Sequence, residues 1–344
     1  MNNTDIIREL PKLDLHCHLS GSIRPGTILE IAKLEGIAHH TDDLEEFRGY
    51  VQAPSECKSL KEYLERFELT LSVMQKKEYL KRIAYELIED VSKQNVLYLE
   101  IRFAPFFHLN GGITFDQAVE AVLAGMEEGR RDFGVLSNLI LILMRHHSPE
   151  RSIEAVKLGR KFLARGVVAI DLAGNEHDFP PELHKEAFQL AKEYGFRRTV
   201  HAGETGIPEN IITAVRDLHA ERIGHGVHAY RAKEVYDFIR ENRIPLELCV
   251  TSNIQTKAIE SYSDHPIRRY LDDGFVVTAN TDNMTVSNTD LNQEYEKLLS
   301  RLGFSLEDLG KVILNGLEVS FASEEDKEQL RKLFNEKLDT LLLK

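Results

Sequence analysis

The stretch LDLHCHLSG, from Leu13 to Gly21, ends a short hydrophobic run with two histidines one residue apart. Side chains at positions i and i+2 of a strand point to the same side, so His16 and His18 can face a common interior and bind one metal ion, with Cys17 turned away. The alternative is a strand whose imidazoles only hydrogen-bond to their surroundings, and an isolated pair favours this alternative. The choice between a metal-binding pair and a hydrogen-bonded pair therefore depends on which residues the rest of the sequence places at the site.

Runs of the same kind recur along the chain. Each is apolar and rich in β-branched residues, stops at a polar cluster and precedes an amphipathic helical pattern, as in a parallel βα architecture. Eight runs can be identified, over residues 12–18, 96–105, 139–144, 167–174, 198–203, 222–226, 244–249 and 275–282. Eight strands close a barrel, so the sequence predicts the α/β class and a (β/α)8 TIM barrel. Because no internal repeat, Pro-rich linker or low-complexity run divides the chain, we expect a single domain over residues 1–344.

Helical periodicity accounts for most of the sequence between these runs. Apolar residues at three- and four-residue spacing predict helices over residues 115–132, 153–164, 181–194 and 235–242. Two regions fall outside the simple alternation: an insertion over residues 19–95, after the first strand, and C-terminal helices over residues 291–343. A barrel carries its active site at the C-terminal ends of the strands, so the insertion is well placed to form a lid.

The insertion contains an apolar stripe at helical spacing. In the segment SLKEYLERFELTLSVM, the stripe consists of Leu60, Tyr63, Leu64, Phe67, Leu71 and Met74. Apolar stripes usually face a core, so packing onto the barrel is the favoured interpretation, with a role in a lid as the alternative.

Composition excludes several classes of function. With 344 residues and 42% hydrophobic residues the chain can bury a large core. Its 43 Lys and Arg against 56 Asp and Glu give a net charge of −13, which repels nucleic acid and anionic membranes. The N-terminus lacks the apolar run of a signal peptide, and no segment is long and apolar enough for a membrane span. Three cysteines without CxxC spacing form no disulfide framework, so we expect a reducing cytoplasm.

Further polar groups stand at the ends of other predicted strands. The segment VHAGETG places His201 and Glu204 after the fifth strand, and RIGHGVH places His225 between two glycines after the sixth. Asp282, in TANTDN, follows the eighth strand, where a carboxylate standing alone would be interpreted as a helix N-cap. Three imidazoles and one carboxylate from the first, fifth and eighth strands together make an N/O-rich site that suits zinc or a similar divalent ion and leaves a position open for water.

These motifs together resemble the adenosine deaminase family, within the metal-dependent amidohydrolase superfamily. The resemblance covers nearly the whole chain and rests on LDLHCHLSGSIRP, EIRFAP, VAIDLAGNE, VHAGE, RIGHG, TSNIQT and NTDN, in this order. It implies the zinc-dependent hydrolytic deamination of adenosine and 2′-deoxyadenosine to inosine and 2′-deoxyinosine plus ammonia, a step of purine salvage. The implied partners are a small purine nucleoside and water, and the oligomeric state stays open.

The resemblance also implies a role for individual residues. One Zn²⁺ per chain is held by His16, His18, His201 and Asp282 and lowers the pKa of water toward about 7. His225 then acts as general base and electrostatic partner, and Glu204 protonates the purine nitrogen beside the attacked carbon. The backbone N–H of Gly174 meets the far edge of the ring, although a simple strand-end turn is the alternative for this glycine.

Two positions depart from the usual family pattern, and both concern the substrate. Ser20 stands where the family usually has an Asp that contacts the ribose 5′-hydroxyl, so we expect tolerance of other groups at the 5′ position. Asn283 replaces a second Asp that bonds the purine N7, and its amide can donate to that nitrogen.

Several other functions stay open on the sequence alone. The nearest is deamination of adenine or of a 5′-modified adenosine, such as 5′-deoxyadenosine, methylthioadenosine or aminodeoxyfutalosine. Adenylate is less favoured, because only Arg24 and Arg102 near the motifs could meet a phosphate. An amidohydrolase that cleaves amides or esters does not need Glu204, and a metal-stabilised protein without activity needs neither Glu204 nor His225.

Overall fold

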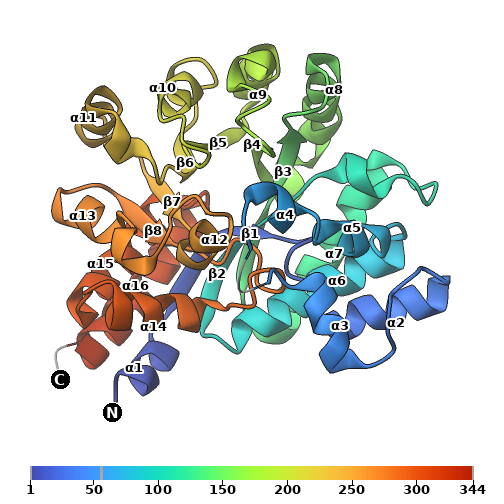
Figure 1. Cartoon of the computed structure of the whole chain (residues 1–344), viewed down its shortest axis with the longest axis horizontal. Coiled ribbons are helices and arrows are strands. Elements are labelled where there is room, and N and C mark those ends of the chain that lie inside the picture. The colour runs from blue at the N-terminus through green and yellow to red at the C-terminus, as the bar shows by residue number, and fades with distance from the viewer. Residues whose placement is uncertain (1, 55–56, 343–344) are drawn as a thin grey trace.

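The computed structural model describes residues 2–54 and 57–342 and shows eight parallel strands surrounded by helices (Figure 1). The strands pair in the order β1 to β8. Their bounds are β1 Lys12–His18, β2 Val96–Phe103, β3 Leu136–Met144, β4 Val167–Ala173, β5 Arg197–Ala202, β6 Arg222–His225, β7 Leu246–Leu248 and β8 Val277–Ala279. Each of the eight predicted runs overlaps one of these strands, which confirms the predicted TIM barrel, although β3 and β5 begin before their predicted starts at residues 139 and 198.

The barrel closes between its first and last strands. Cys17 and Asp282 form a parallel bridge. The His18 N–H donates to the Asp282 carbonyl at 2.7 Å, and the Asp282 N–H donates to the His16 carbonyl at 2.8 Å. The backbone that completes the barrel therefore belongs to three residues predicted to bind the metal.

Several predicted strands are longer than the observed ones. Pro105, predicted to end the second strand, begins the 3₁₀ helix η1 Pro105–His108, and β7 and β8 each have three residues. After β8 the chain leaves the ladder, and Asp282 has a φ of 61°, in the left-handed region. Hydrophobicity continues through these segments because they remain buried, so a pattern of burial alone overestimates the length of the ladder.

The four predicted helices all contain helical structure, with different bounds. The first is α7 Phe115–Phe133 and the last is α11 Lys233–Glu241. The second begins earlier than predicted, as α8 Pro149–Gly159, and continues as the 3₁₀ helix η2 Arg160–Arg165. The Ser148 side chain accepts the Arg151 N–H, so this N-cap sets the start of α8. The third divides into η3 Pro181–His184 and α9 Lys185–Tyr194.

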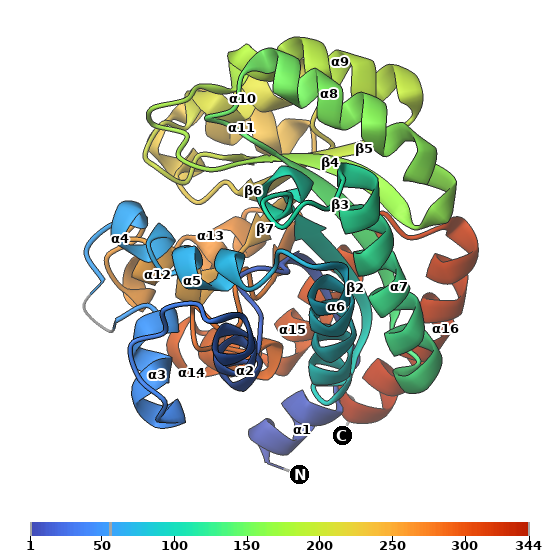
Figure 2. The ribbon, with the colours of Figure 1, turned by 90° about the vertical axis from the view of Figure 1, so that its right-hand side faces the viewer.

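The insertion after β1 forms short helices beside the mouth of the barrel (Figure 2). They are α2 Pro25–Glu35, α3 Leu44–Val51, α4 Leu60–Leu64 and α5 Phe67–Ser72, followed by the longer α6 Lys77–Ser92. The apolar stripe is therefore shared between α4 and α5 instead of following one helix. Five of the six residues of the stripe line the cavity of the barrel, namely Leu60, Tyr63, Leu64, Phe67 and Leu71. The sixth, Met74, does not. These five residues line the site and do not belong to the main hydrophobic core, which contains only Met74 of the stripe, and this supports the lid interpretation.

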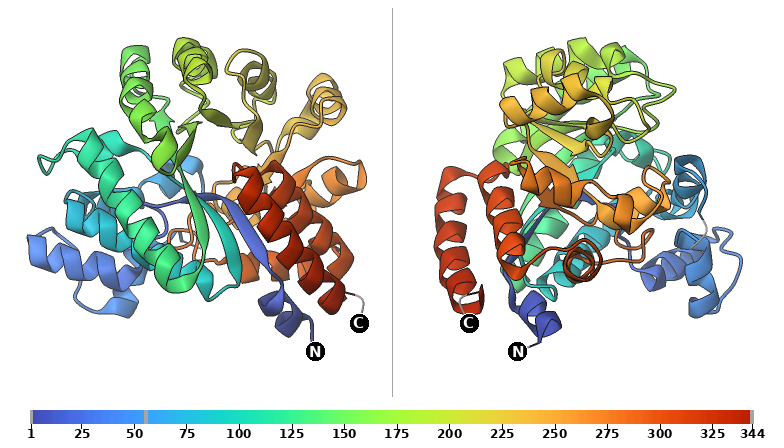
Figure 3. Two further views of the ribbon diagram at one scale, coloured as in Figure 1. Left: turned by 180° about the vertical axis from the view of Figure 1, so that it is seen from behind. Right: turned by 60° about the vertical axis from the view of Figure 1, so that its left-hand side comes forward.

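The C-terminal helices pack beside the first strand, as the view from behind shows (Figure 3). They are α14 Leu291–Arg301, α15 Leu306–Val319 and α16 Glu324–Leu342, and α15 contacts both β1 and β8. Leu343, the predicted end of this region, lies outside the described residues. The remaining helices are α1 Asn3–Glu9, α10 Glu209–Arg216, η4 Ala229–Arg231, α12 Val250–Gln255, η5 Tyr262–Asp264 and α13 Ile267–Asp272. Among the described helices, none has the length and apolar character that crossing a membrane requires.

Candidate active site

A cavity of about 380 Å³ opens at the C-terminal ends of the strands. Of the nine residues predicted for the site, eight line it: His18, Ser20, Gly174, His201, Glu204, His225, Asp282 and Asn283. The ninth, His16, is fully buried behind them. The fold therefore brings together residues that are up to 267 positions apart, as Asn283 is from His16.

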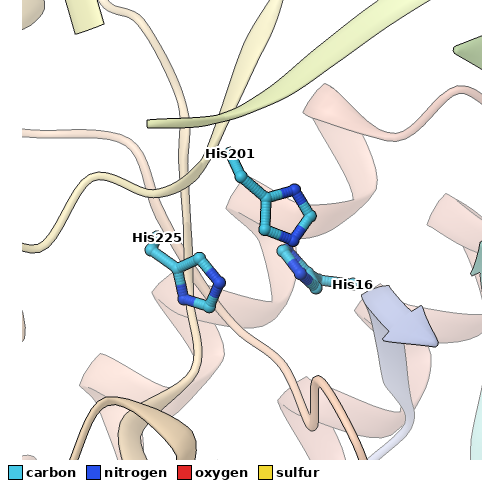
Figure 4. A group of neighbouring side chains, drawn as sticks. All are labelled: His16, His201 and His225. Atoms are coloured by element: carbon cyan, nitrogen blue, oxygen red, sulfur yellow. The ribbon is translucent and has the colours of Figure 1, made fainter. Parts of the chain in front are cut away.

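Four of these side chains converge closely enough to share one ion. His18 Nε2 lies 3.3 Å from His16 Nε2 and 3.3 Å from His201 Nε2. Asp282 Oδ1 lies 3.3 Å from His18 Nε2 and 3.6 Å from His16 Nε2. The His16 and His201 rings approach each other edge to face (Figure 4).

The remaining ring nitrogens show which atoms face the centre of this cluster. His16 Nδ1 lies 2.9 Å from Glu247 Oε2, and His201 Nδ1 lies 3.0 Å from the Asp171 carboxylate. A carboxylate accepts the Nδ1 proton, so in the neutral rings each Nε2 presents a lone pair. Burial lowers the pKa of His16 well below its usual value, which keeps that ring neutral. Nε2 lone pairs at this distance repel one another unless a cation lies between them. Three imidazoles and one carboxylate are a ligand set that binds zinc.

The sequence analysis missed the carboxylates that orient these imidazoles. Glu247 and Asp171 lie within the apolar strands β7 and β4 and are fully buried, and Arg102 joins them at 2.9 Å to each. Burial raises the pKa of Glu247, but Arg102 and Arg222 outweigh it and lower the pKa to about 2. An acid in the middle of an apolar strand was the available signal, because a buried charge requires a partner.

Glu204 is held in the cavity by the loop that follows β5. The Glu176 carboxylate accepts the backbone N–H groups of Gly203 at 3.0 Å and of Glu204 and Thr205 at 2.7 Å each. Burial raises the pKa of Glu204 to about 7, so this carboxyl group can carry a proton at neutral pH. Glu176, in the motif DLAGNE, is a third carboxylate that the sequence analysis did not assign.

His225 lies close both to Glu204 and to the cluster of His16, His18, His201 and Asp282. Its Nε2 lies 3.8 Å from Glu204 Oε2, and its ring centroid lies 4.9 Å from that of His16 (Figure 4). The neighbouring Gly224 allows this approach, because a Cβ there would lie 3.0 Å from His16 Cε1 and 3.2 Å from His201 Cα. Burial lowers the pKa of His225 to about 4.

The predicted substrate residues lie on the other walls of the cavity. Asn283 packs on Gly21, where a Cβ would lie 1.8 Å from its Oδ1. Within the described residues this buried oxygen has no hydrogen-bond partner. Gly174 has a φ of 110°, which a residue with a side chain rarely adopts. Ser20 lines the same cavity as the residues of α4 and α5.

Neither arginine considered for phosphate binding is available. Arg24 pairs with Glu89 at 2.7 Å and Asp90 at 2.6 Å, and Arg102 is fully buried among the carboxylates described above. Among residues 2–54 and 57–342, no Lys or Arg lines the cavity. The walls are largely apolar, with contributions from Phe67, Phe107 and Ile142, so they suit a neutral ligand better than a phosphorylated one.

Comparisons with known proteins show which family the chain resembles along nearly its whole length. A family model described as adenosine deaminase matches residues 11–337. The adenosine deaminase of Clostridium kluyveri is 52% identical over 341 residues, which cover 99% of this chain and 97% of that protein. The adenine deaminase of Arthrobacter aurescens superposes with a TM-score of 0.89 at 27% identity, covering 97% and 100% of the two chains. A Burkholderia ambifaria amidohydrolase with bound Zn has a TM-score of 0.89 at 27% identity, covering 99% and 94%.

Proposed function

The chain belongs to the adenosine deaminase family, and on that basis we infer that it is a hydrolase that converts adenosine and 2′-deoxyadenosine to inosine and 2′-deoxyinosine, with release of ammonia. The observation that supports this function is that Glu204 and His225 line the same cavity as His18, His201 and Asp282, with His16 buried next to these three side chains. A structural metal site would need neither of the first two residues.

We propose that His16, His18, His201 and Asp282 hold one zinc ion. When bound, zinc lowers the pKa of water toward about 7 and so supplies a nucleophile at neutral pH. Glu247 and Asp171 keep the imidazoles of His16 and His201 in the tautomer that presents Nε2.

Glu204 is the proposed general acid. In its protonated form it donates to the purine nitrogen beside the amino-bearing carbon, so the ring can accept electrons as the oxygen of water adds to that carbon. The C–N bond then breaks and the amino group leaves as ammonia, while the two protons of the water molecule end on the leaving amino group and on the Glu204 carboxylate, which restores the general acid. The hydrogen bonds from Gly203, Glu204 and Thr205 to Glu176 hold the general acid in place for this transfer.

The cavity walls account for nucleoside binding. We propose that the N–H of Gly174 meets one edge of the purine and that the Asn283 side chain donates to N7 at another edge. Apolar residues of α4 and α5, including Leu60 and Phe67, cover the base and exclude water.

The test is an ultraviolet assay of zinc-loaded protein with adenosine, 2′-deoxyadenosine, adenine and methylthioadenosine. We expect adenosine and 2′-deoxyadenosine to be converted, and a Glu204→Gln variant to lose ammonia release while it keeps its zinc. Conversion of none of the four purines would contradict the proposed reaction. Zinc loss in the Glu204→Gln variant would contradict a purely chemical role for Glu204.

A second candidate is the deamination of a 5′-modified adenosine. Ser20 is small and neutral, and it lines the same cavity as the apolar side chains of Leu64 and Leu71, which suit a deoxy or thioether substituent.

We place the reaction in the cytoplasm, because Cys17, Cys57 and Cys249 are all buried free thiols.

A further inference from the structure

The His225 ring lies at one end of a chain of buried hydrogen bonds that leads away from the cavity. Asn253 Nδ2 lies 3.1 Å from His225 Nδ1. Asn253 Oδ1 lies 3.3 Å from His265 Nε2, and His265 Nδ1 lies 3.3 Å from the backbone nitrogen of Ile267. Asn253 is fully buried and His265 is 4% exposed, so bulk water does not compete for these bonds.

The backbone group at the far end sets the direction of every bond in the chain. The Ile267 N–H can only donate, so His265 Nδ1 must accept. In the neutral ring the proton then sits on His265 Nε2, which donates to Asn253 Oδ1. The amide nitrogen of Asn253 therefore faces His225 and donates to its Nδ1, which leaves the proton of the neutral His225 ring on Nε2.

The opposite direction of these hydrogen bonds is excluded by the number of donors and acceptors on His265. If the Asn253 amide were turned over, its nitrogen would donate to His265 Nε2, and both nitrogens of that ring would have to accept. A neutral imidazole has one acceptor nitrogen only. Protonation of both nitrogens of His265 would set two N–H groups against each other at Ile267, and burial lowers the pKa of His265 to about 3.

We propose that Asn253 and His265 are positioning residues that hold His225 in the Nε2–H tautomer, so that this ring directs a hydrogen-bond donor into the cavity beside Glu204. The proposal rests on the proposed function only for its effect on catalysis, since the tautomer follows from the hydrogen bonds alone. Neither residue lines the cavity.

The consequence is a specific role for His225. A ring that already carries a proton on Nε2 cannot take another one there as a neutral general base, but it can donate to an oxygen that carries negative charge. Of the two roles expected for His225 from the sequence, the structure thus assigns the electrostatic one. Removal of a donor of this kind typically lowers kcat by about 100- to 1,000-fold.

The tautomer can be read directly by nitrogen NMR. Zinc-loaded protein is labelled with ¹⁵N-histidine, and the His225 signals are identified by their absence from a His225→Gln variant. We expect Nε2 of His225 to carry the proton and Nδ1 to be bare. A protonated Nδ1 in the wild-type protein would overturn the proposal, whatever the substrate of the enzyme is.

One variant should reverse the tautomer of His225. Asn253→Asp keeps the shape of the side chain but removes its only donor, so the proton of neutral His225 must move to Nδ1. We expect the NMR pattern to reverse and kcat for adenosine to fall at least 100-fold, with KM within threefold and zinc content unchanged. A retained pattern and retained kcat would overturn the proposal.

The matched control is His265→Gln, whose amide nitrogen can still donate to Asn253. We expect this variant to keep the wild-type tautomer and to keep kcat within about tenfold, whereas His265→Leu should lose both. If Asn253→Asp does not fold, this second pair decides the question: equal effects of Gln and Leu would contradict a role in setting the tautomer. If none of the proteins converts adenosine while the NMR pattern is as expected, the proposed function fails and the tautomer assignment stands.

Discussion

Glu247 Oε2 lies 2.9 Å from His16 Nδ1 and the same distance from a guanidinium nitrogen of Arg102, so one fully buried carboxylate contacts both the proposed metal-binding cluster and the interior of the barrel. Loss of this charge should therefore lower both the affinity for zinc and the stability of the fold. For Glu247→Gln we expect the affinity for zinc to fall about 10- to 100-fold, because the carboxylate that accepts the Nδ1 proton of His16 orients that imidazole. We also expect about 3 kcal/mol or more of lost stability, because Arg102 loses a buried partner.

Competition with a zinc-selective chelator measures the first effect, and urea unfolding measures the second. The exposed Glu45→Gln serves as the control, since its pair with Arg48 lies on the surface. Unchanged zinc affinity in Glu247→Gln would show that His16 does not need this carboxylate.

The carboxylate of Glu176 should matter for the rate more than for the metal. A Gln at this position presents one acceptor oxygen where the loop of Gly203, Glu204 and Thr205 offers donors to both oxygens. Each unpaired buried N–H costs about 1–3 kcal/mol, so Glu176→Gln should let the loop shift and lower kcat about tenfold or more. Zinc content should stay at the wild-type level, and a wild-type kcat would contradict the positioning of Glu204 by this residue.

Asn283 should contribute through a hydrogen bond to the substrate. We expect Asn283→Ala to lose about 1–3 kcal/mol of transition-state stabilisation, which is the cost of a buried hydrogen bond that is no longer made. The comparison of kcat/KM for adenosine in the two proteins measures this loss. An unchanged value would refute the proposed contact.

The identity of residue 20 should control the 5′ position of the substrate. Ser20→Asp introduces a charged acceptor, and a hydrogen bond to a charged group contributes about 1.5–3 kcal/mol. We expect the ratio of kcat/KM for adenosine to that for 5′-deoxyadenosine to rise about tenfold or more. The wild-type protein should accept both substrates, and a strong preference for adenosine before the substitution would rule out the tolerance that we propose.

The pH dependence of stability should contain a contribution from Asp308, in the first turn of α15. Its carboxylate accepts from the Ser305 N–H at 3.0 Å and from Arg268 at 2.7 Å. Partial burial raises the pKa of Asp308, but these hydrogen bonds outweigh it and hold the pKa well below the usual range. A lowered pKa means that the stabilisation is complete above the unfolded-state value of about 3.9 and is lost as the pH falls toward the folded-state value.

Asp308→Asn should therefore destabilise the protein by about 1–2 kcal/mol at pH 7, and the difference from wild type should shrink below pH 4. Urea unfolding of both proteins at pH 7 and at pH 3.5 provides the measurement. A difference that is the same at both pH values would mean that the charge of Asp308 does not contribute.

Much of the molecule could be predicted from local patterns. Alternation of buried runs with amphipathic segments identifies the eight strands, because a parallel strand covered on both faces must be apolar along its length. The position of each polar cluster at the end of a run then locates the site, since parallel strands bring their C-terminal ends to one face of a barrel. The match to several ordered motifs adds the assignment of His16, His201 and Asp282, which no single motif could support.

Other features depend on contacts between distant segments and left little trace in any single motif. The sequence alone determined the barrel and which residues gather at its mouth, because periodicity and strand ends are local properties. Only the tertiary structure decided that Glu247, Asp171 and Arg102 form one buried network behind the metal cluster, that Glu176 holds the loop of Glu204, and that Asn253 faces His225. Such partners are set by distance and hydrogen-bond direction in three dimensions, and neither can be derived from the order of residues along the chain.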